Sequence, residues 1–150
     1  MEPIGLYIHV PFCLSKCPYC DFYSYAASDE AMDAYTAAVE RALADWAARI
    51  GVPADTLYIG GGTPSLLGGA RLARLVEAAR RGFGLRDAEI TLEANPADDL
   101  DETLRAFAAA GGSRLSLAVR RSGRAAAPWP PAYHRRRGAR RPGRRAGRAR

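Results

Sequence analysis

The pattern that most constrains this fold is a regular alternation of short strand-like stretches and longer helical ones. We expect strands at residues 6–10, 56–59, 88–93 and 114–119, and helices between them at 29–49, 69–81 and 101–110. Strands separated by helices favour a parallel sheet with right-handed crossovers. Residues 1–119 are therefore predicted to form an α/β unit.

The first two helices have clear boundaries in the sequence. Ser28 or Asp29 is a plausible N-cap for the first helix, and Gly51-Val52-Pro53 ends it. Gly82 and Gly84 are expected to end the second helix. The apolar face of the first helix is predicted to comprise Met32, Tyr35, Val39, Leu43 and Trp46.

Residues 120–150 differ sharply from the part before them. They contain 12 Arg and no acidic residue, and they lack Leu, Ile, Val and Phe, so we expect disorder. Residues 1–119 carry a net charge of −6, so the overall charge of +6 comes from this tail. Nucleic-acid contact and an interaction arm are two interpretations of the tail. We favour a third, a reading-frame change in a GC-rich coding sequence, because the break follows a strand that should lead into another helix.

The sequence also indicates a compartment. It contains no run of 18 apolar residues, and its start lacks the features of a signal peptide. Three cysteines close together argue against a disulfide framework and suit a reducing environment. We therefore expect a cytoplasmic protein without a membrane span.

All three cysteines lie in one loop after the first predicted strand, as Cys13, Cys17 and Cys20 in the spacing CxxxCxxC. Closely spaced thiolates of this kind hold iron–sulfur clusters, and a missing fourth cysteine would leave one iron open to a small molecule. A zinc site completed by His9, or free thiols, are the alternatives. His9 is more simply read as a satisfied strand residue.

Two further features follow the second and third predicted strands. The run Gly60-Gly61-Gly62-Thr63-Pro64 allows either a tight turn or a close approach of backbone to a ligand, and Glu93 ends the next strand. Glu93 could form a salt bridge, face solvent, or accept hydrogen bonds from ligand hydroxyl or ammonium groups. Because the carboxyl ends of parallel strands share one edge, both features are expected beside the cysteine loop.

Together these motifs resemble the radical S-adenosylmethionine (SAM) proteins. More narrowly, they resemble the oxygen-independent coproporphyrinogen III oxidase family and, within it, the HemW-like heme chaperones. The resemblance covers residues 4–119. The motifs that carry it are Tyr7-Ile8-His9-Val10-Pro11-Phe12-Cys13, the CxxxCxxC loop with Tyr19, Gly60-Gly61-Gly62-Thr63-Pro64-Ser65-Leu66-Leu67, and Glu93-Ala94-Asn95-Pro96.

The resemblance implies the N-terminal half of a partial (β/α)6 barrel that binds a [4Fe-4S] cluster and SAM. In such proteins an electron from the cluster cleaves SAM to methionine and a 5′-deoxyadenosyl radical. Heme or porphyrin is the implied partner, and a flavodoxin or ferredoxin the implied electron donor; nucleic acid is not expected. The implied cluster ligands are Cys13, Cys17 and Cys20, and the implied SAM contacts are Tyr7, Tyr19, Gly61, Gly62, Thr63 and Glu93.

The sequence departs from the family pattern at two places. Asp21 and Phe22 follow the third cysteine, where the oxidases have a further CxC pattern, so the chaperone branch is favoured. Arg120-Arg121-Ser122 stands where the family continues with a Gln-Ser-Phe stretch. We therefore expect a truncated heme chaperone-like protein that is inactive alone. The alternatives are an oxidase that converts propionates to vinyl groups, and a zinc or nucleic-acid binding module.

Overall fold

The computed structural model describes residues 2–15, 20–96 and 100–117. Four parallel strands form one sheet in the order β1-β2-β3-β4, which is also their order along the chain. The strands are β1 (Ile4–Val10), β2 (Ala54–Gly61), β3 (Glu89–Ala94) and β4 (Arg114–Leu117). The predicted division at residue 119 and the predicted disorder of residues 120–150 lie outside the described residues.

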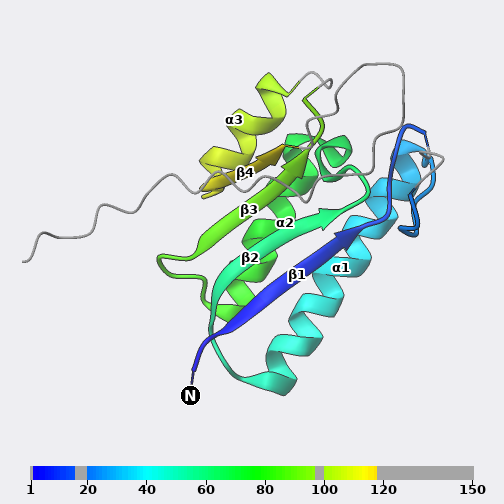
Figure 1. The fold of residues 1–150 in the computed structure, drawn as a ribbon. Coiled ribbons are helices and arrows are strands. Elements are labelled where there is room, and N and C mark those ends of the chain that lie inside the picture. The colour runs from blue at the N-terminus through cyan, green and yellow to red at the C-terminus, as the bar shows by residue number, and fades with distance from the viewer. Residues whose placement is uncertain (1, 16–19, 97–99, 118–150) are drawn as a thin grey trace, which may run out of the picture.

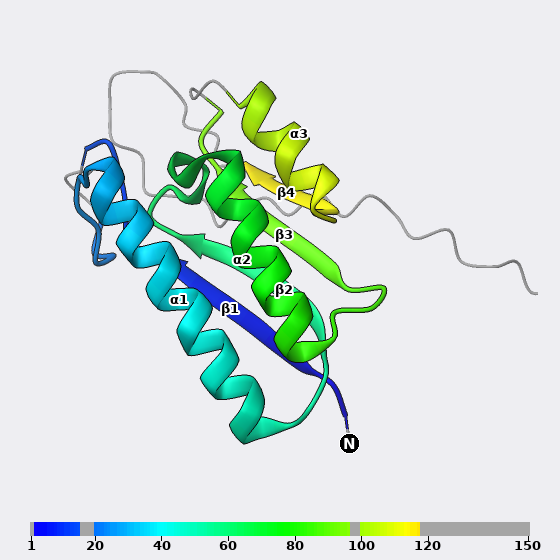
Figure 2. The same ribbon diagram turned by 180° about the vertical axis from the view of Figure 1, so that it is seen from behind.

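Three helices connect these strands and lie on the same side of the sheet (Figures 1 and 2). They are α1 (Asp29–Ile50), α2 (Gly68–Phe83) and α3 (Asp101–Ala109), and a short 3-10 turn, η1 (Pro64–Leu67), precedes α2. The predicted strand–helix alternation is therefore correct. No helix within the described ranges is long and apolar enough to cross a membrane.

Both ends of α1 follow the chemistry of the sequence. The Ser28 side chain accepts a hydrogen bond from the backbone N–H of Ala31, as an N-cap does, and Gly51 ends α1 in the left-handed conformation. Gly82 does not end α2, because this helix continues to Phe83 and Gly84 provides the left-handed cap. The predicted stop at Gly84 is therefore confirmed, whereas Gly82 lies within the helix.

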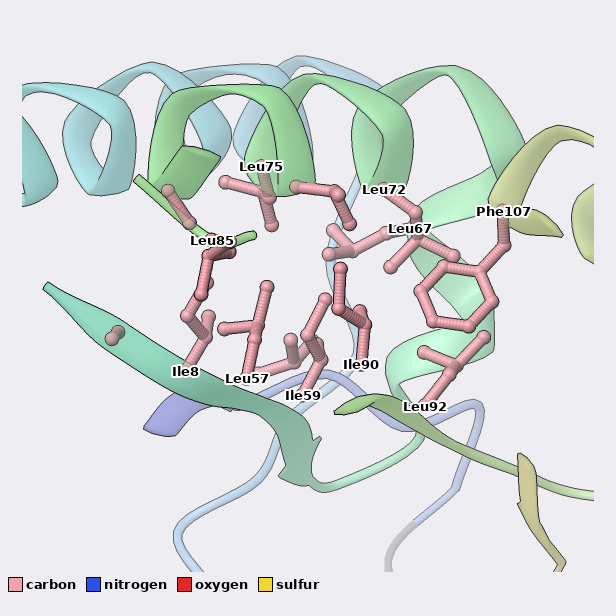
Figure 3. Close-up of a cluster of buried hydrophobic side chains, with 14 of the residues drawn as sticks. Ile8, Leu57, Ile59, Leu67, Leu72, Leu75, Leu85, Ile90, Leu92 and Phe107 are labelled. Atoms are coloured by element: carbon pink, nitrogen blue, oxygen red, sulfur yellow. The ribbon is translucent and has the colours of Figure 1, made fainter. Parts of the chain in front are cut away.

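The core lies between the sheet and the helices, with α2 at its centre. Figure 3 shows Leu72 and Leu75 of α2 facing Leu57 and Ile59 of the sheet. The buried side chains that α2 contributes are Leu72, Leu75, Val76, Ala78, Ala79 and Phe83. A long apolar face and a central place between two other helices make α2 the main cover of the sheet.

Trp46 is a correction to the predicted apolar face of α1. Its side chain is 57% exposed, whereas Ala47 packs against the core one position later. Met32, Tyr35, Val39 and Leu43 do pack there, as predicted. An apolar stripe at a spacing of three and four residues rotates slowly around a helix of 22 residues, so its last member is the easiest to misplace.

The sheet leaves its second face without a described helix, and this face is polar. Successive residues of a strand point to opposite faces, so the buried Ile8 and Val10 of β1 alternate with Tyr7 and His9. The same alternation places Tyr58 of β2 and Glu93 of β3 on the face of Tyr7. This polar face carries three side chains of the candidate site, those of Tyr7, Tyr58 and Glu93.

Candidate functional site

The candidate site is built where three neighbouring strands end. Figure 1 shows the arrowheads of β1, β2 and β3 pointing the same way, toward the segment that follows β1. The cysteine loop follows β1, the glycine run ends β2, and Glu93 lies near the end of β3. The convergence predicted from the sequence is thus present in the described residues.

The cysteine loop is held at its base by the chain that returns from it. The backbone N–H of Cys13 donates to the carbonyl of Tyr25 over 3.1 Å, and the N–H of Tyr25 donates to the carbonyl of Pro11 over 2.9 Å. Between them Phe12 is 1% exposed, with Tyr25 and Tyr35 packed edge-on against its ring. This anchored base fixes the point at which the loop leaves the sheet.

The glycine run approaches the start of the cysteine loop very closely. The N–H of Gly62 donates to the carbonyl of Val10, and the N–H of Thr63 donates to the carbonyl of Phe12, each over 2.7 Å. A Cβ on Gly62 would lie 2.5 Å from the Phe12 oxygen and 3.0 Å from the Cys13 sulfur. Only glycine permits this approach, which answers why the run needs it here.

A side-chain contact completes this junction. The Thr63 hydroxyl donates to the Cys13 sulfur over 3.6 Å. The Cys13 and Cys20 thiols are free and neither is fully exposed. Cys17 and Tyr19 lie outside the described residues, and within those residues no group of three metal-ligating side chains occurs. The three-cysteine ligand set therefore stays a prediction.

Glu93 is held by two donors from β2. The Tyr58 hydroxyl donates to Oε1 over 2.5 Å, and the backbone N–H of Gly61 donates to Oε2 over 3.1 Å. Gly60 allows the strand to pass this close, since a Cβ there would lie 3.0 Å from Oε2. The predicted alternative of a salt bridge is not what the described ion pairs show, because Glu93 is in none of them.

Three aromatic or imidazole rings line the polar face beside Glu93. The rings of Tyr7 and Tyr58 stack with centroids 5.9 Å apart. The His9 ring nitrogens lie 3.4 Å from the Tyr7 hydroxyl and 3.4 Å from the Tyr23 carbonyl oxygen, as expected for a satisfied strand residue. The Tyr35 hydroxyl also donates to the carbonyl of His9, over 2.5 Å.

The pKa values of Tyr7, Tyr35 and Tyr58 are all raised, which favours the protonated hydroxyl. Burial, followed by the hydrogen bond to Glu93, raises the pKa of Tyr58 to about 12. Burial raises the pKa of Tyr35 to about 12 as well. Partial burial and then the charge of Glu93 raise the pKa of Tyr7. These shifts keep the three hydroxyls protonated further into the alkaline range than an unperturbed tyrosine would be.

The structure thus brings together six of the residues singled out in the sequence, and it adds one. The sequence analysis did not single out Tyr58. It lies two residues before Gly60 and therefore on the same face of β2 as Gly60, the face on which Glu93 lies. The register that carries its hydroxyl to Glu93 was not readable from the sequence alone. The residues brought together are Tyr7, Cys13, Gly61, Gly62, Thr63 and Glu93.

Comparison with known proteins gives consistent matches. The family model described as Radical SAM superfamily matches residues 7–145. A heme chaperone HemW of Mycobacterium tuberculosis (strain ATCC 25618 / H37Rv) is 44% identical over 123 residues, which are 79% of this chain and 32% of that protein. The HemW of Escherichia coli (strain K12) is 42% identical over 122 residues, again 79% and 32%. The chain therefore spans about a third of the length of these curated relatives.

A solved structure agrees with these sequence matches. The coproporphyrinogen III oxidase (HemN) of Escherichia coli, described as a radical SAM enzyme, superposes with a TM-score of 0.73 at 33% identity. The match covers 81% of this chain and 29% of that one. It confirms the predicted α/β fold class, and the HemW relatives confirm the family resemblance. The family model matches more than half of the residues of this chain, and the chain therefore belongs to the radical SAM superfamily.

Proposed function

We propose that this chain binds a [4Fe-4S] cluster through Cys13, Cys17 and Cys20, and SAM beside it. The observation that carries the proposal is the junction of the cysteine loop with the glycine run, where Gly62 lies against Cys13 and Gly61 holds Glu93. Thiolates are the usual protein ligands of such clusters. When bound, the cluster would supply the electron for reductive cleavage of SAM.

The described residues fit these two groups in different ways. Free thiols at Cys13 and Cys20 are suitable ligands, and a hydroxyl that donates to the Cys13 sulfur would lower the negative charge borne by a ligating thiolate. Glu93 has lone pairs left after its two hydrogen bonds and could accept from a ligand hydroxyl or ammonium. Tyr7 and Tyr58 offer an aromatic surface next to that carboxylate.

Anaerobic reconstitution of the full chain with iron and sulfide tests this proposal. We expect about four irons and four sulfides per chain, a brown protein, and saturable binding of radiolabelled SAM in equilibrium dialysis. A Cys17→Ala variant should lose the iron and the SAM together. A colourless protein that instead retains one zinc would refute the proposal.

The larger function that we propose is that of a heme chaperone-like radical SAM protein. The HemW relatives are 34–44% identical to this chain, and Asp21 and Phe22 replace the cysteine pattern expected of the oxidases. We further propose a cytoplasmic setting, a heme or porphyrin partner and a flavodoxin- or ferredoxin-like electron donor. Because the chain spans a third of its relatives, transfer of heme is proposed for a protein that includes the remaining part.

An oxidase is the second candidate, favoured by the fold similarity to HemN. Anaerobic incubation of the reconstituted chain with coproporphyrinogen, SAM and a reductant separates the two. Vinyl products would support the oxidase. Stable heme binding, followed in the Soret band, without any vinyl product would support the chaperone.

A further inference from the structure

Tyr58 is a residue of the site that no sequence motif marks. It lies in the middle of β2, between the core residues Leu57 and Ile59, and its side chain points to the polar face. In the sheet register it pairs with Thr91, so Glu93 lies two residues further along β3 on the same face. The Tyr58 side chain thus crosses from β2 to the end of β3.

Its hydroxyl makes one of the two hydrogen bonds that hold Glu93. Tyr58 donates to Oε1 over 2.5 Å, and the N–H of Gly61 donates to Oε2 over 3.1 Å. Each carboxylate oxygen has two lone pairs, so one on each oxygen stays available to a ligand. A carboxylate that accepts a hydrogen bond at each oxygen cannot rotate freely about the Cγ–Cδ bond.

The Tyr58 ring is itself held in place from one side. Tyr7 stacks on it with ring planes 28° apart. The Tyr58 hydroxyl is protonated at neutral pH, as in any tyrosine, and its raised pKa extends its role as a donor to Glu93 into the alkaline range. The hydroxyl of Ser116, which pairs with Glu93 in the register of β3 and β4, acts in the opposite direction on that pKa.

We infer that Tyr58 is a positioning residue, whose hydroxyl holds the Glu93 carboxylate in the orientation in which it accepts hydroxyl or ammonium groups of SAM. This inference rests on the proposed function. A side chain that is ordered before the ligand arrives costs less conformational entropy when the ligand binds. Tyr58 contributes to affinity through Glu93 and needs no contact with SAM.

A double-mutant cycle tests whether the hydroxyl acts through Glu93. The four proteins are the wild-type full chain, Tyr58→Phe, Glu93→Gln and the double variant, each reconstituted anaerobically and measured by equilibrium dialysis with radiolabelled SAM. Tyr58→Phe keeps the ring that stacks on Tyr7 and removes only the hydroxyl. We expect it to weaken SAM binding about tenfold, as for a lost hydrogen bond to a charged group, but less than twofold in the Glu93→Gln background.

Thr36→Val is the matched control, because it removes a buried hydroxyl that donates to the Met32 carbonyl over 2.8 Å, within α1 and away from Glu93. It should change SAM affinity less than twofold. Equal affinity of wild type and Tyr58→Phe would overturn the inference, as would a tenfold loss from Tyr58→Phe in both backgrounds. Failure of the iron-loaded wild type to bind SAM would instead refute the proposed function, and the inference with it.

Discussion

The closest backbone approach in the site, at Gly62, gives a sharp prediction. Replacing Gly62 with Ala would place a Cβ 2.5 Å from the Phe12 carbonyl oxygen and 3.0 Å from the Cys13 sulfur. Phe12 is 1% exposed and packed against two aromatic rings, so it has little room to retreat. The glycine run must then move away from the cysteine loop.

Two effects determine how much stability Gly62→Ala is expected to lose. Overpacking at a buried position costs about 1–3 kcal/mol. Moving the run also weakens the hydrogen bonds that the N–H groups of Gly62 and Thr63 donate over 2.7 Å, each worth about 0.5–1.5 kcal/mol. We therefore expect Gly62→Ala to lower the free energy of unfolding by about 2–4 kcal/mol, measured by urea denaturation of the iron-free chain.

A second glycine separates this local effect from general instability. Gly84 caps α2 with a φ of 59°, and a Cβ there would meet nothing within 4 Å. Gly84→Ala should cost about 1–2 kcal/mol through backbone strain alone and leave iron content and SAM affinity unchanged after reconstitution. Gly62→Ala should lose both. Wild-type stability and SAM affinity in Gly62→Ala would refute the argument, as would an equal loss of SAM binding in Gly84→Ala.

Three further predictions concern the cluster, the tyrosines and the core. Cys13→Ser should reduce bound iron to background after anaerobic reconstitution, while the circular dichroism of the iron-free chain stays unchanged. Burial raises the pKa values of Tyr35 and Tyr58 from 10.0 to about 12, so the fold favours their protonated forms. This stabilisation is complete below pH 10 and should be lost as the pH rises toward 12, which urea denaturation across that range would measure. Phe107→Ala should lower the free energy of unfolding by about 3–5 kcal/mol, because the ring is 4% exposed and joins α3 to the core.

Local patterns predicted the elements and their common edge well, because each depends on a short stretch of sequence. The Ser28 cap, the glycine run and the end of β3 are of this kind. Tyr58 shows where such patterns stop, since its role depends on the register between two strands that lie far apart in the sequence. Trp46 shows a second limit, because a small rotation along a long helix decides which of two neighbouring side chains is buried.

The edge of the sheet at β4 leads to a final prediction, about association. Leu115 and Leu117 are 38% and 44% exposed there, and within residues 2–15, 20–96 and 100–117 β4 pairs only with β3. Exposed apolar edge strands promote pairing between chains, and a charged side chain on the edge opposes it. Leu117→Lys should therefore raise the concentration at which the chain stays monomeric in light scattering. Trp46→Lys is the control, because it adds the same charge at a 57% exposed residue that lies on a helix, α1, and not on a strand. An equal gain in both variants would mean that net charge, and not the edge of β4, governs association.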